Sequence, residues 1–373
     1  MDMPLNEPFW NPYRLVPAKE VRDRQPPKTH ERFDGHCGII SCTLENLTPL
    51  FIWNSRPETD RNFLKRNGSF VIPGSSLKGM FRSLAELVGG GCFSVSSKRG
   101  MNNSPPTPVP KEMAKCDDIH RLCITCRMFG AMEEKANARV HMGKVGISDA
   151  IWQGPPNARC QPFEVYLSGC GVRHEPFYRS PHTGQLDGKS RKLYFHQPMH
   201  QTSIQSIPAQ IRKQAWRVHA LPAGQQFRFE VQFTNLTDSE LSLLLYIIAL
   251  EKTVDVRIDH SIRLRGPMRH KIGNAKPLGM GSCAIHIERL TYLAPPQERF
   301  SALRHTSRHI LEKDSLKKEI EIRIQPYVTD RSPTMEGVRK MMVWDELDKR
   351  IFRYPDYTWF QNSDNKKVPL KNL

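Results

Sequence analysis

Alternating apolar and polar side chains predict the strands of this protein. Residues 37–52 alternate in their first half, and residues 225–233 carry Phe, Phe, Val and Phe at every second position. Side chains two residues apart point to the same face of a strand, so both segments predict a strand with one buried face. Further strands are expected over residues 70–72, 140–148 and 282–290.

Two helices are predicted from apolar residues that recur every three or four positions. The first covers residues 76–88, and the second covers residues 237–252 and begins at Thr237 or Asp238. The apolar stripe of the first helix contains Leu77, Met80, Phe81, Leu84 and Leu87 or Val88. Such a stripe allows the helix to pack one face against a sheet.

The order of these elements is strand, helix, strand, an insertion, and again strand, helix, strand. Two such halves predict an α+β fold of the ferredoxin-like, RNA-recognition-motif type. We expect residues 1–34 to form an arm with little structure of its own and residues 35–294 to form the main domain. Within that domain, residues 89–139 and 152–218 read as insertions, and residues 295–373 form a charged, partly helical C-terminal extension.

Charge and cysteine content narrow the class of protein. The 373 residues contain 55 Lys and Arg against 38 Asp and Glu, which gives a net charge of +17 and indicates a polyanionic partner. The longest apolar run, residues 241–250, is too short to span a membrane, and the N-terminal residues lack a signal-peptide pattern. We therefore expect a cytoplasmic protein with no membrane partner. The nine cysteines then favour free thiols or metal ligands over disulfides.

The segment "PGSSLKG", residues 73–79, places hydroxyls and a cation at the start of the first helix. A helix N-terminus has unpaired N–H groups and partial positive charge, so it can bind phosphate. Ser75, Ser76 and Lys78 would add donors, and Arg82 follows one turn later. The alternative is an ordinary helix start, capped by Ser75 or Ser76.

A glycine-rich segment, "GNAKPLGMGS" at residues 273–282, follows a basic loop that includes Arg269. Gly279 and Gly281 permit close approach of a ligand to the backbone, and Lys276 supplies a charge. No Gly-Lys-Ser/Thr follows, which excludes a P-loop, and a strand rather than a helix is predicted to follow, which excludes a dinucleotide-binding fingerprint. The alternative is a tight turn into that strand.

A cysteine-rich segment, "CDDIHRLCITC" at residues 116–126, has the spacing of a zinc site. A metal would stabilise an insertion that has no core of its own. The predicted ligands are Cys116, His120, Cys123 and Cys126, and Cys92 and His141 compete with His120 for the fourth position. The alternative is a group of reduced free thiols.

Two acidic residues, Glu58 and Asp60, lie in the basic segment "RPETDRNFLKR". A carboxylate among cations is commonly an ion-pair partner. A carboxylate can also hold a divalent ion beside an RNA phosphate or position a 2′-OH for strand scission.

Together these segments resemble the RAMP superfamily, the RNA-binding proteins of CRISPR effector complexes. The resemblance covers roughly residues 10–290. Within the superfamily, the chain is most similar to the crRNA-binding backbone subunit of type III and type III-derived systems. It rests on six segments in the family's order: "LTPLFI" (47–52), "VIPGSSLKGMFRS" (71–83), "CITCRMFGA" (123–131), "GISDA" (146–150), "SRKLYFHQP" (190–198) and "KPLGMGS" (276–282).

The resemblance implies a palm of the RNA-recognition type and a thumb β-hairpin, which we expect within residues 152–218. Such subunits form a filament along the guide RNA, bind complementary target RNA and contact other effector subunits. The first helix and the glycine-rich loop would hold the guide backbone, together with Arg191 and Lys192 in "SRKLYFHQP". The cysteine cluster matches a Zn²⁺ site of relatives. Bases would stack on Phe63, Tyr178, Tyr194 and Phe195, unless these residues belong to the core.

Catalysis is left open by the resemblance. In cleaving relatives an aspartate before "PGSS" cuts target RNA with Mg²⁺ or another divalent ion, and Asp60 falls near that position. The usual glycine-isoleucine before this aspartate is replaced by Pro57, Glu58 and Thr59. The chain is therefore either a scaffold that leaves cutting to a separate nuclease or a metal-dependent endoribonuclease. A third alternative is an endoribonuclease that processes precursor crRNA.

Overall fold

The computed structural model provides the structure of this chain. It describes residues 10–21, 23–53, 61–93, 109–155, 159–165, 174–180, 183–198, 216–295, 298, 308–355 and 357–370.

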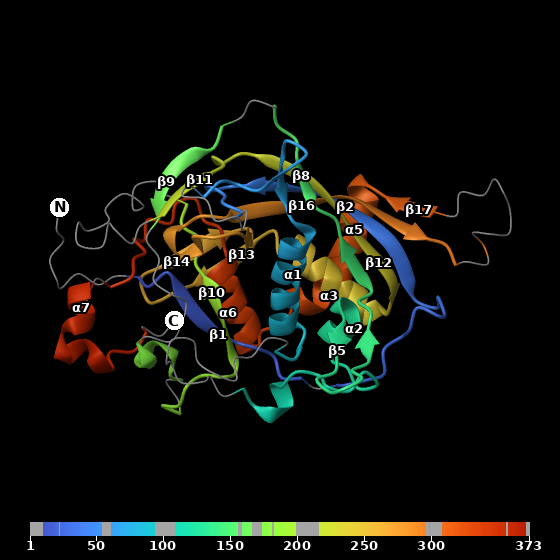
Figure 1. Cartoon of the computed structure of the whole chain (residues 1–373), viewed down its shortest axis with the longest axis horizontal. Helices are drawn as coiled ribbons and strands as arrows, with labels where there is room; N and C mark the ends of the chain where they lie inside the picture. Colours follow the sequence, from blue (N-terminus) through green and yellow to red (C-terminus); the bar gives the residue numbers. More distant parts are fainter. Residues whose placement is uncertain are drawn as a thin grey trace.

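A curved antiparallel sheet forms the centre of the molecule (Figure 1). Its middle strands are β2 (His36–Asn46), β12 (Gln226–Leu236) and β16 (Ser282–Leu293). Strand β2 pairs with both others, and β12 pairs on its far side with the short strands β7 (Val145–Ile147) and β8 (Ala150–Trp152). The order across the sheet is therefore β16, β2, β12 and then β7 and β8. In a ferredoxin-like sheet the fourth, first, third and second strands follow one another in the same way.

Four short strands complete this sheet. Strand β4 (Ser69–Ile72) pairs with β8 and carries the edge strand β3 (Lys65–Arg66). At the opposite side, β15 (His270–Lys271) and β17 (Arg308–Leu311) both pair with β16. The strand expected over residues 140–148 is two separate strands, β7 and a strand of the first insertion.

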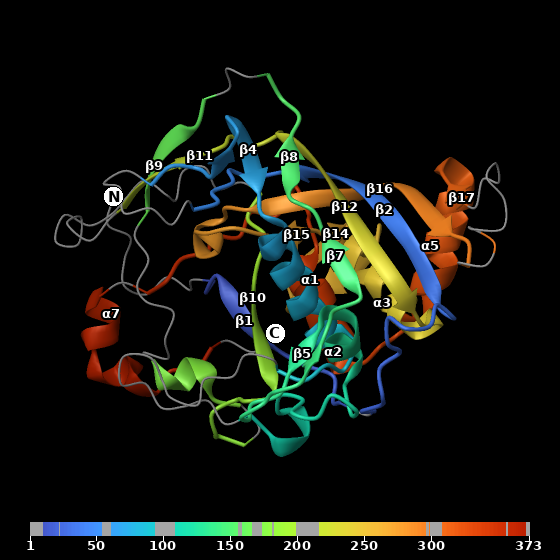
Figure 2. The ribbon, with the colours of Figure 1, turned by 45° about the vertical axis from the view of Figure 1, so that its right-hand side comes forward.

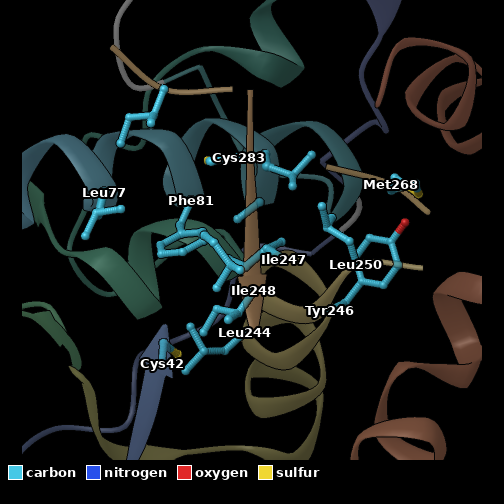
Figure 3. Close-up of a cluster of buried hydrophobic side chains, with 14 of the residues drawn as sticks. Cys42, Leu77, Phe81, Leu244, Tyr246, Ile247, Ile248, Leu250, Met268 and Cys283 are labelled. Atoms are coloured by element: carbon cyan, nitrogen blue, oxygen red, sulfur yellow. The ribbon is translucent and has the colours of Figure 1, made fainter. Parts of the chain in front are cut away.

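Two helices cover one face of the sheet and form the core with it. Helix α1 (Gly74–Val88) starts two residues earlier than predicted, and α3 (Asp238–Ala249) begins after Thr237, whose hydroxyl makes a capping box with Glu240. Figure 3 shows the contact between the helices. Its buried side chains include Leu77 and Phe81 of α1, Leu244, Tyr246, Ile247 and Ile248 of α3, and Cys42 and Cys283 of the sheet.

The first insertion is small and has its own cysteine-lined centre. It contains helix α2 (Ile124–Phe129), a 3-10 turn η2 (Lys111–Met113), and the hairpin of β5 (Ala131–Met132) and β6 (Val140–His141). Its cysteines and Leu122 form a buried cluster apart from the main core, whereas Met113, Met128 and Phe129 pack into the main core. The insertion is therefore both anchored to the main domain and built around a cysteine group that a metal could hold.

The second insertion splits into two parts. Strands β9 (Gln161–Val165) and β11 (Trp216–Ala220) form an antiparallel pair at the side of the molecule opposite β17 (Figure 2). Between them in sequence lie a 3-10 turn, η3 (Glu175–Tyr178), and β10 (Ser190–Tyr194). Strand β10 returns to the body of the molecule, so only the β9–β11 pair is a candidate for the base of a thumb.

Residues of the arm expected over residues 1–34 form part of the body of the molecule, contrary to that expectation, although residues 1–9 and 22 lie outside the described part. Strand β1 (Tyr13–Pro17) pairs with β10. Tyr13 and Val16 are 2% exposed, and Ala18 N–H donates to Lys189 O at 2.9 Å. The sequence of this polar, proline-rich segment did not predict its pairing, because the partner strand β10 lies about half of the chain away.

The C-terminal segment is part of the core and not a tail. Helix α5 (Lys313–Val328) packs on α3, with Tyr327 stacked on Tyr246 at 4.6 Å between ring centroids. Helix α6 (Pro333–Met342) packs against β1 and the hairpin of β13 (Val254–Arg257) and β14 (Arg263–Gly266). The short helix α7 (Tyr357–Gln361) and the 3-10 turn η6 (Ser363–Lys367) lie at the edge of the molecule (Figure 1).

Candidate nucleic-acid interface and metal centre

The glycine-rich segment forms a tight turn between β15 and β16, with the 3-10 turn η5 (Lys276–Leu278) inside it. Gly279 and Gly281 have φ of 85° and 80°, in the left-handed region that favours glycine. A Cβ on Gly281 would lie 1.9 Å from the Ile272 carbonyl oxygen. The backbone therefore approaches itself closely here, and side chains at these glycines are excluded.

Three cations converge on this turn: Arg269 before β15, Lys271 in β15 and Lys276 in η5. Lys271 Nζ donates to Phe195 O at 2.9 Å, and Arg269 Nη1 donates to Met268 O at 3.3 Å. Among the residues that the structure describes, none of the three forms an ion pair with a carboxylate. The carboxylates of Glu45 and Glu346 attract Arg269 without forming an ion pair with it, so the positive charge is only partly balanced.

Burial destabilises the charged form of these three side chains, because it removes them from water. It lowers the pKa of all three side chains, and the pKa of Lys271 falls to about 7 because burial is reinforced by repulsion from Lys276. A bound anion would offset this cost, because an opposite charge favours the protonated form. Of the predicted RNA contacts, the structure brings Arg269, Lys276, Gly279 and Gly281 together in one place.

Two residues of this site, His196 and Gln197, were not selected from the sequence. His196 is 4% exposed, and its ring nitrogens lie 2.8 Å from Ser282 Oγ and 3.0 Å from Arg269 O. Gln197 Nε2 donates to Pro277 O at 3.0 Å. They lie in the segment "SRKLYFHQP" that carries the family resemblance, but no separate pattern in the sequence marks them.

The N-terminus of α1 differs from the phosphate cradle expected there. Pro73 occupies the cap position, and neither Ser75 nor Ser76 caps the helix. The Gly74 N–H donates to Asp149 Oδ1 at 2.8 Å, and Arg66 forms an ion pair with the same carboxylate. A protein carboxylate thus takes the place that a phosphate would need at the first N–H.

The cations of "PGSSLKG" and of the adjoining helix are separated. Lys78 is half-buried, and burial lowers its pKa. Arg82 points to the first insertion, where Nη1 donates to Gly130 O at 3.1 Å and Nε to Glu86 Oε1 at 3.2 Å. Arg82 is therefore a structural residue in this arrangement, and of the pair only Lys78 stays a candidate for binding phosphate.

Arg191 and Lys192 are also held by the protein. Arg191 pairs with Glu86, which is 2% exposed, and its guanidinium lies 4.0 Å from the Phe93 ring centroid. Lys192 Nζ lies 3.8 Å above the Tyr13 ring. The rings of Tyr178 and Tyr194 lie 5.5 and 5.6 Å from the same ammonium. Both side chains fasten β10 to the body of the molecule.

The proposed base-stacking residues are mostly core. Phe63 and Phe195 are 3% and 1% exposed, so neither presents a ring to a ligand. Tyr178 and Tyr194 belong to the cluster around Lys192. The outward positions of β2 and β12 carry no aromatic side chain; they are Ile39, Ser41, Thr43, Glu45, Gln226, Arg228, Glu230 and Gln232. Base stacking on the open sheet face, as in RNA-recognition motifs, therefore has no platform here.

Asp60 and Glu58 lie outside the described residues. The residues that flank their segment are described: Trp53 bridges to Phe63, and the Arg61 guanidinium lies 4.7 Å from the Trp53 ring. Arg61 N–H donates to Arg217 O at 3.3 Å, so the chain directly after Asp60 runs beside β11.

Four buried cysteines form a candidate metal centre. The Sγ atoms of Cys92, Cys116, Cys123 and Cys126 all lie within 4.8 Å of one another. Cys92 Sγ and Cys126 Sγ are 3.4 Å apart, too far for a disulfide and close to the roughly 3.8 Å edge of a zinc–thiolate tetrahedron. The four thiols can hold a structural metal such as Zn²⁺.

Hydrogen-bond donors around the sulfurs fit thiolate ligands. Arg24 Nη1 lies 2.9 Å from Cys116 Sγ, and Arg82 Nη2 lies 3.6 Å from Cys126 Sγ. The Cys123 N–H donates to Cys116 Sγ at 3.3 Å. These donors and charges would offset the negative charge of four thiolates around one divalent ion.

The ligand set differs from the predicted one at one position. His120 is exposed, and its Nε2 lies 2.9 Å from Arg139 Nη1, outside the cysteine group. His141 lies elsewhere too, with Nε2 3.0 Å from Arg127 O. Cys92 is the fourth member, and the fold brings it there from the end of α1. Cys92 was one of the three candidates for the fourth position, but its separation of 24 residues from Cys116 meant that spacing alone could not choose it over His120.

No helix in the described part of the chain is both long enough and apolar enough to cross a membrane.

The fold and this site define a class: a ferredoxin-like α+β protein with a cationic glycine-rich turn and a four-cysteine centre. The family model described as the RAMP superfamily matches residues 43–283, well over half of the chain. The protein belongs to the RAMP superfamily.

Comparison with individual proteins adds one solved structure. A chain of a structure titled "Type IV-B CRISPR Complex" is 14% identical, with a TM-score of 0.35. The similarity covers 72% of this chain and 93% of that chain. A search of curated proteins finds none that matches.

Proposed function

We propose that this RAMP protein is the crRNA-binding backbone subunit of a CRISPR effector complex. The observation that carries the proposal is the group of Arg269, Lys271 and Lys276 around the glycine-rich turn. These cations are partly or largely buried and form no ion pair with a carboxylate among the described residues, although Glu45 and Glu346 attract Arg269 from farther away. A phosphate of the guide would supply further negative charge in direct contact.

The same geometry favours sequence-independent binding. Lys and Arg contacts to phosphate carry no base information, and a guide differs in sequence from one crRNA to the next. The tight turn lets a sugar–phosphate backbone lie against main chain at Gly279 and Gly281. The net charge of +17 suits a subunit that contacts many phosphates. Pairing between guide and target RNA would then supply specificity.

Further parts of the proposal follow from the motif resemblance. Copies of the subunit would form a filament along the guide, in a type III or type III-derived complex with other effector subunits. The β9–β11 pair would form the base of the thumb. Co-expression with a CRISPR array tests this assembly, because a backbone subunit should purify as a ladder of oligomers on guide RNA.

Salt-dependent RNA binding tests the site itself. Each lost phosphate contact should lower the slope of log affinity against log salt by about 0.7 for single-stranded RNA. We expect this reduction in Arg269→Ala and in Lys276→Ala. The matched control is Arg228→Ala, which removes an exposed arginine from the outer sheet face. Unchanged slopes in both site variants, with folding intact, would contradict the proposed site.

Target cleavage at Asp60 is a second candidate function. The observation in its favour is that Arg61 holds the adjoining chain against β11, beside the candidate thumb. Particles from co-expression should then cut labelled complementary RNA into regularly spaced fragments with Mg²⁺. Asp60→Ala should abolish the fragments and Glu58→Ala should keep them. Guide-dependent binding without fragments from any protein would make the subunit a scaffold and assign cutting to a separate nuclease.

A further inference from the structure

Trp53 is the most exposed aromatic side chain in the part of the chain that the structure describes. It is 43% exposed, whereas Phe63 and Phe195, which were expected to stack bases, are 3% and 1% exposed. A ligand can therefore reach the Trp53 ring without any movement of the core. Single-stranded nucleic acids bind accessible aromatic rings of this kind through their bases.

The chain beneath Trp53 is fixed to the sheet. Trp53 forms an antiparallel bridge with Phe63. Beside this bridge, the Leu64 N–H donates to Ile52 O at 2.9 Å. The Phe63 ring packs edge-on against the Phe70 ring, with 5.5 Å between the two centroids. Little of this backbone has to be ordered when a ligand binds, so the entropy cost of binding at the ring is small.

One face of the Trp53 ring is already covered by a cation. The guanidinium of Arg61 lies over the ring, 4.7 Å from its centroid. Arg61 is held in place by β11, because its N–H donates to Arg217 O at 3.3 Å and its carbonyl accepts from the His219 N–H at 2.9 Å. The exposed surface of Trp53 is therefore on the opposite face and the edges, where one flat partner can stack.

The charge around this ring favours RNA over a protein partner. Lys65 is exposed, and its Nζ lies 4.5 Å from the Phe70 ring, so a second cation lies on the same short segment as Arg61. A nucleotide joins a flat ring to a phosphate, whereas an aromatic side chain of a protein brings no negative charge. Stacking tolerates every base, because each base has a π-face, and this suits guides of any sequence.

We propose that Trp53 stacks one unpaired base of the guide RNA while Arg61 supports the opposite face of the indole ring. The base must be unpaired, because bases inside a duplex are covered by their neighbours on both faces. The inference rests on the proposed function and names a second contact with the guide, beside the β9–β11 pair. Lys65 would attract the phosphate next to the stacked base.

A fluorescent base tests this contact on the full-length protein. The probe is a single-stranded oligouridine RNA with one 2-aminopurine, whose fluorescence is quenched when the base stacks. Wild type should quench the bound probe. Trp53→Ala should abolish the quenching and weaken binding about tenfold, as expected for the loss of one stacked base. Its slope of log affinity against log salt should equal that of wild type, because no phosphate contact is removed.

Two further variants assign the effect to the ring. Trp53→Phe keeps an aromatic face and should retain most of the quenching and affinity. Phe33→Ala is the matched control, because Phe33 is 40% exposed and lines a hollow with His309 of β17, on the other side of the molecule. It should behave as wild type. Melting temperatures establish that each variant is folded.

The outcomes separate stacking from guide binding itself. Equal quenching and affinity in wild type and Trp53→Ala would overturn the role of Trp53 and leave the site at the glycine-rich turn standing. Loss of oligomers on guide RNA in Trp53→Ala, with quenching kept, would make Trp53 a contact between copies and would overturn the role too. Failure of wild type to bind the probe would overturn the proposed function.

Discussion

The ammonium of Lys271 shows how burial changes a single residue. In solution a lysine is protonated throughout the neutral range, but burial and repulsion from Lys276 lower this pKa to about 7. Its Nζ donates to a backbone carbonyl and lies 3.4 Å from Ser282 Oγ. A phosphate beside it would raise the pKa again, so RNA binding and proton uptake are linked at this residue.

This linkage predicts a fall in RNA affinity as pH rises above about 7. The decrease should approach about tenfold per pH unit, the limit for one linked proton. Lys271→Met should weaken binding at pH 7 and flatten the pH dependence. Fluorescence anisotropy from pH 6.5 to 9 measures both. The exposed Lys252→Met is the control, and an equal slope in Lys271→Met and wild type would contradict the prediction.

Stability of the RNA-free protein should change with pH in the opposite direction. The folded pKa of Lys271, about 7, lies below its unfolded value of 10.5. Between these values the unfolded chain binds more protons, so this residue makes the free energy of unfolding rise with pH. Urea titrations at pH 7 and 9, on wild type and Lys271→Met, measure the contribution as the difference between the two proteins.

At the scale of elements, one buried carboxylate joins three pieces of structure. Glu240 in the first turn of α3 accepts from Lys144 Nζ at 2.6 Å and from Arg127 Nε at 2.9 Å. Lys144 directly precedes β7, and Arg127 is in α2 of the first insertion. Glu240 and Lys144 are both fully buried. This network fixes the cysteine-bearing insertion to the palm.

Glu240→Gln should therefore destabilise the protein by about 3 kcal/mol, because it leaves a buried ammonium without its counter-charge. Glu230→Gln, an exposed carboxylate on the outer face of β12, should change little. Urea unfolding of the two variants makes the comparison. A Glu240→Gln protein as stable as wild type would show that the ion pairs cost as much to desolvate as they contribute.

The metal centre makes a second prediction at this scale. Purified protein should contain about one zinc per chain, and Cys92→Ser should lose it because the tetrahedral set becomes incomplete. His120→Ala and Cys160→Ser should keep the metal, since neither residue belongs to the cluster. Elemental analysis measures the metal content. Retention of zinc by Cys92→Ser together with its loss in His120→Ala would restore the ligand set expected from spacing.

At the scale of the whole molecule, the C-terminal segment completes the core. Ile320, Ile324 and Val338 belong to the same buried cluster as the palm. Arg339 pairs with Glu251 at 2.9 Å, and both side chains are 6% exposed. The terminal helices therefore cover a face of α3 that the palm alone would leave open.

Truncation after Leu293 should therefore prevent stable folding and not yield a free palm. The truncated chain would expose Tyr246 and leave Glu251 without Arg339. Loss of a cooperative thermal transition, or recovery only in the insoluble fraction, is the expected result. A truncated protein that melts cooperatively near the wild-type temperature would show that the extension is dispensable for the core.

Local sequence signals predicted the elements whose geometry is local. Periodicity located β2, β12, β16, α1 and α3, and the Thr237 cap is present because a capping box involves residues only three apart. The glycine pattern at Gly279 and Gly281 likewise marked a turn with positive φ. The order of these elements was sufficient to predict the ferredoxin-like arrangement, since few topologies join two such halves without crossing connections.

Tertiary structure decided which charged and sulfur-bearing groups meet. Arg82 and Arg191 were predicted to bind phosphate. In the structure both contact Glu86, and Arg82 also lies beside the Cys126 sulfur. Cys92 and Gln197 gain their roles only because α1 and β10 end beside segments distant in sequence. A pattern of side chains reports the conformation of its own segment, but the partner of a charge, thiol or amide depends on long-range packing. For this protein the sequence by itself determined the strands and helices of the ferredoxin-like domain, because their patterns are local, and the fold decided which charges, thiols and amides lie together, because those contacts join distant segments.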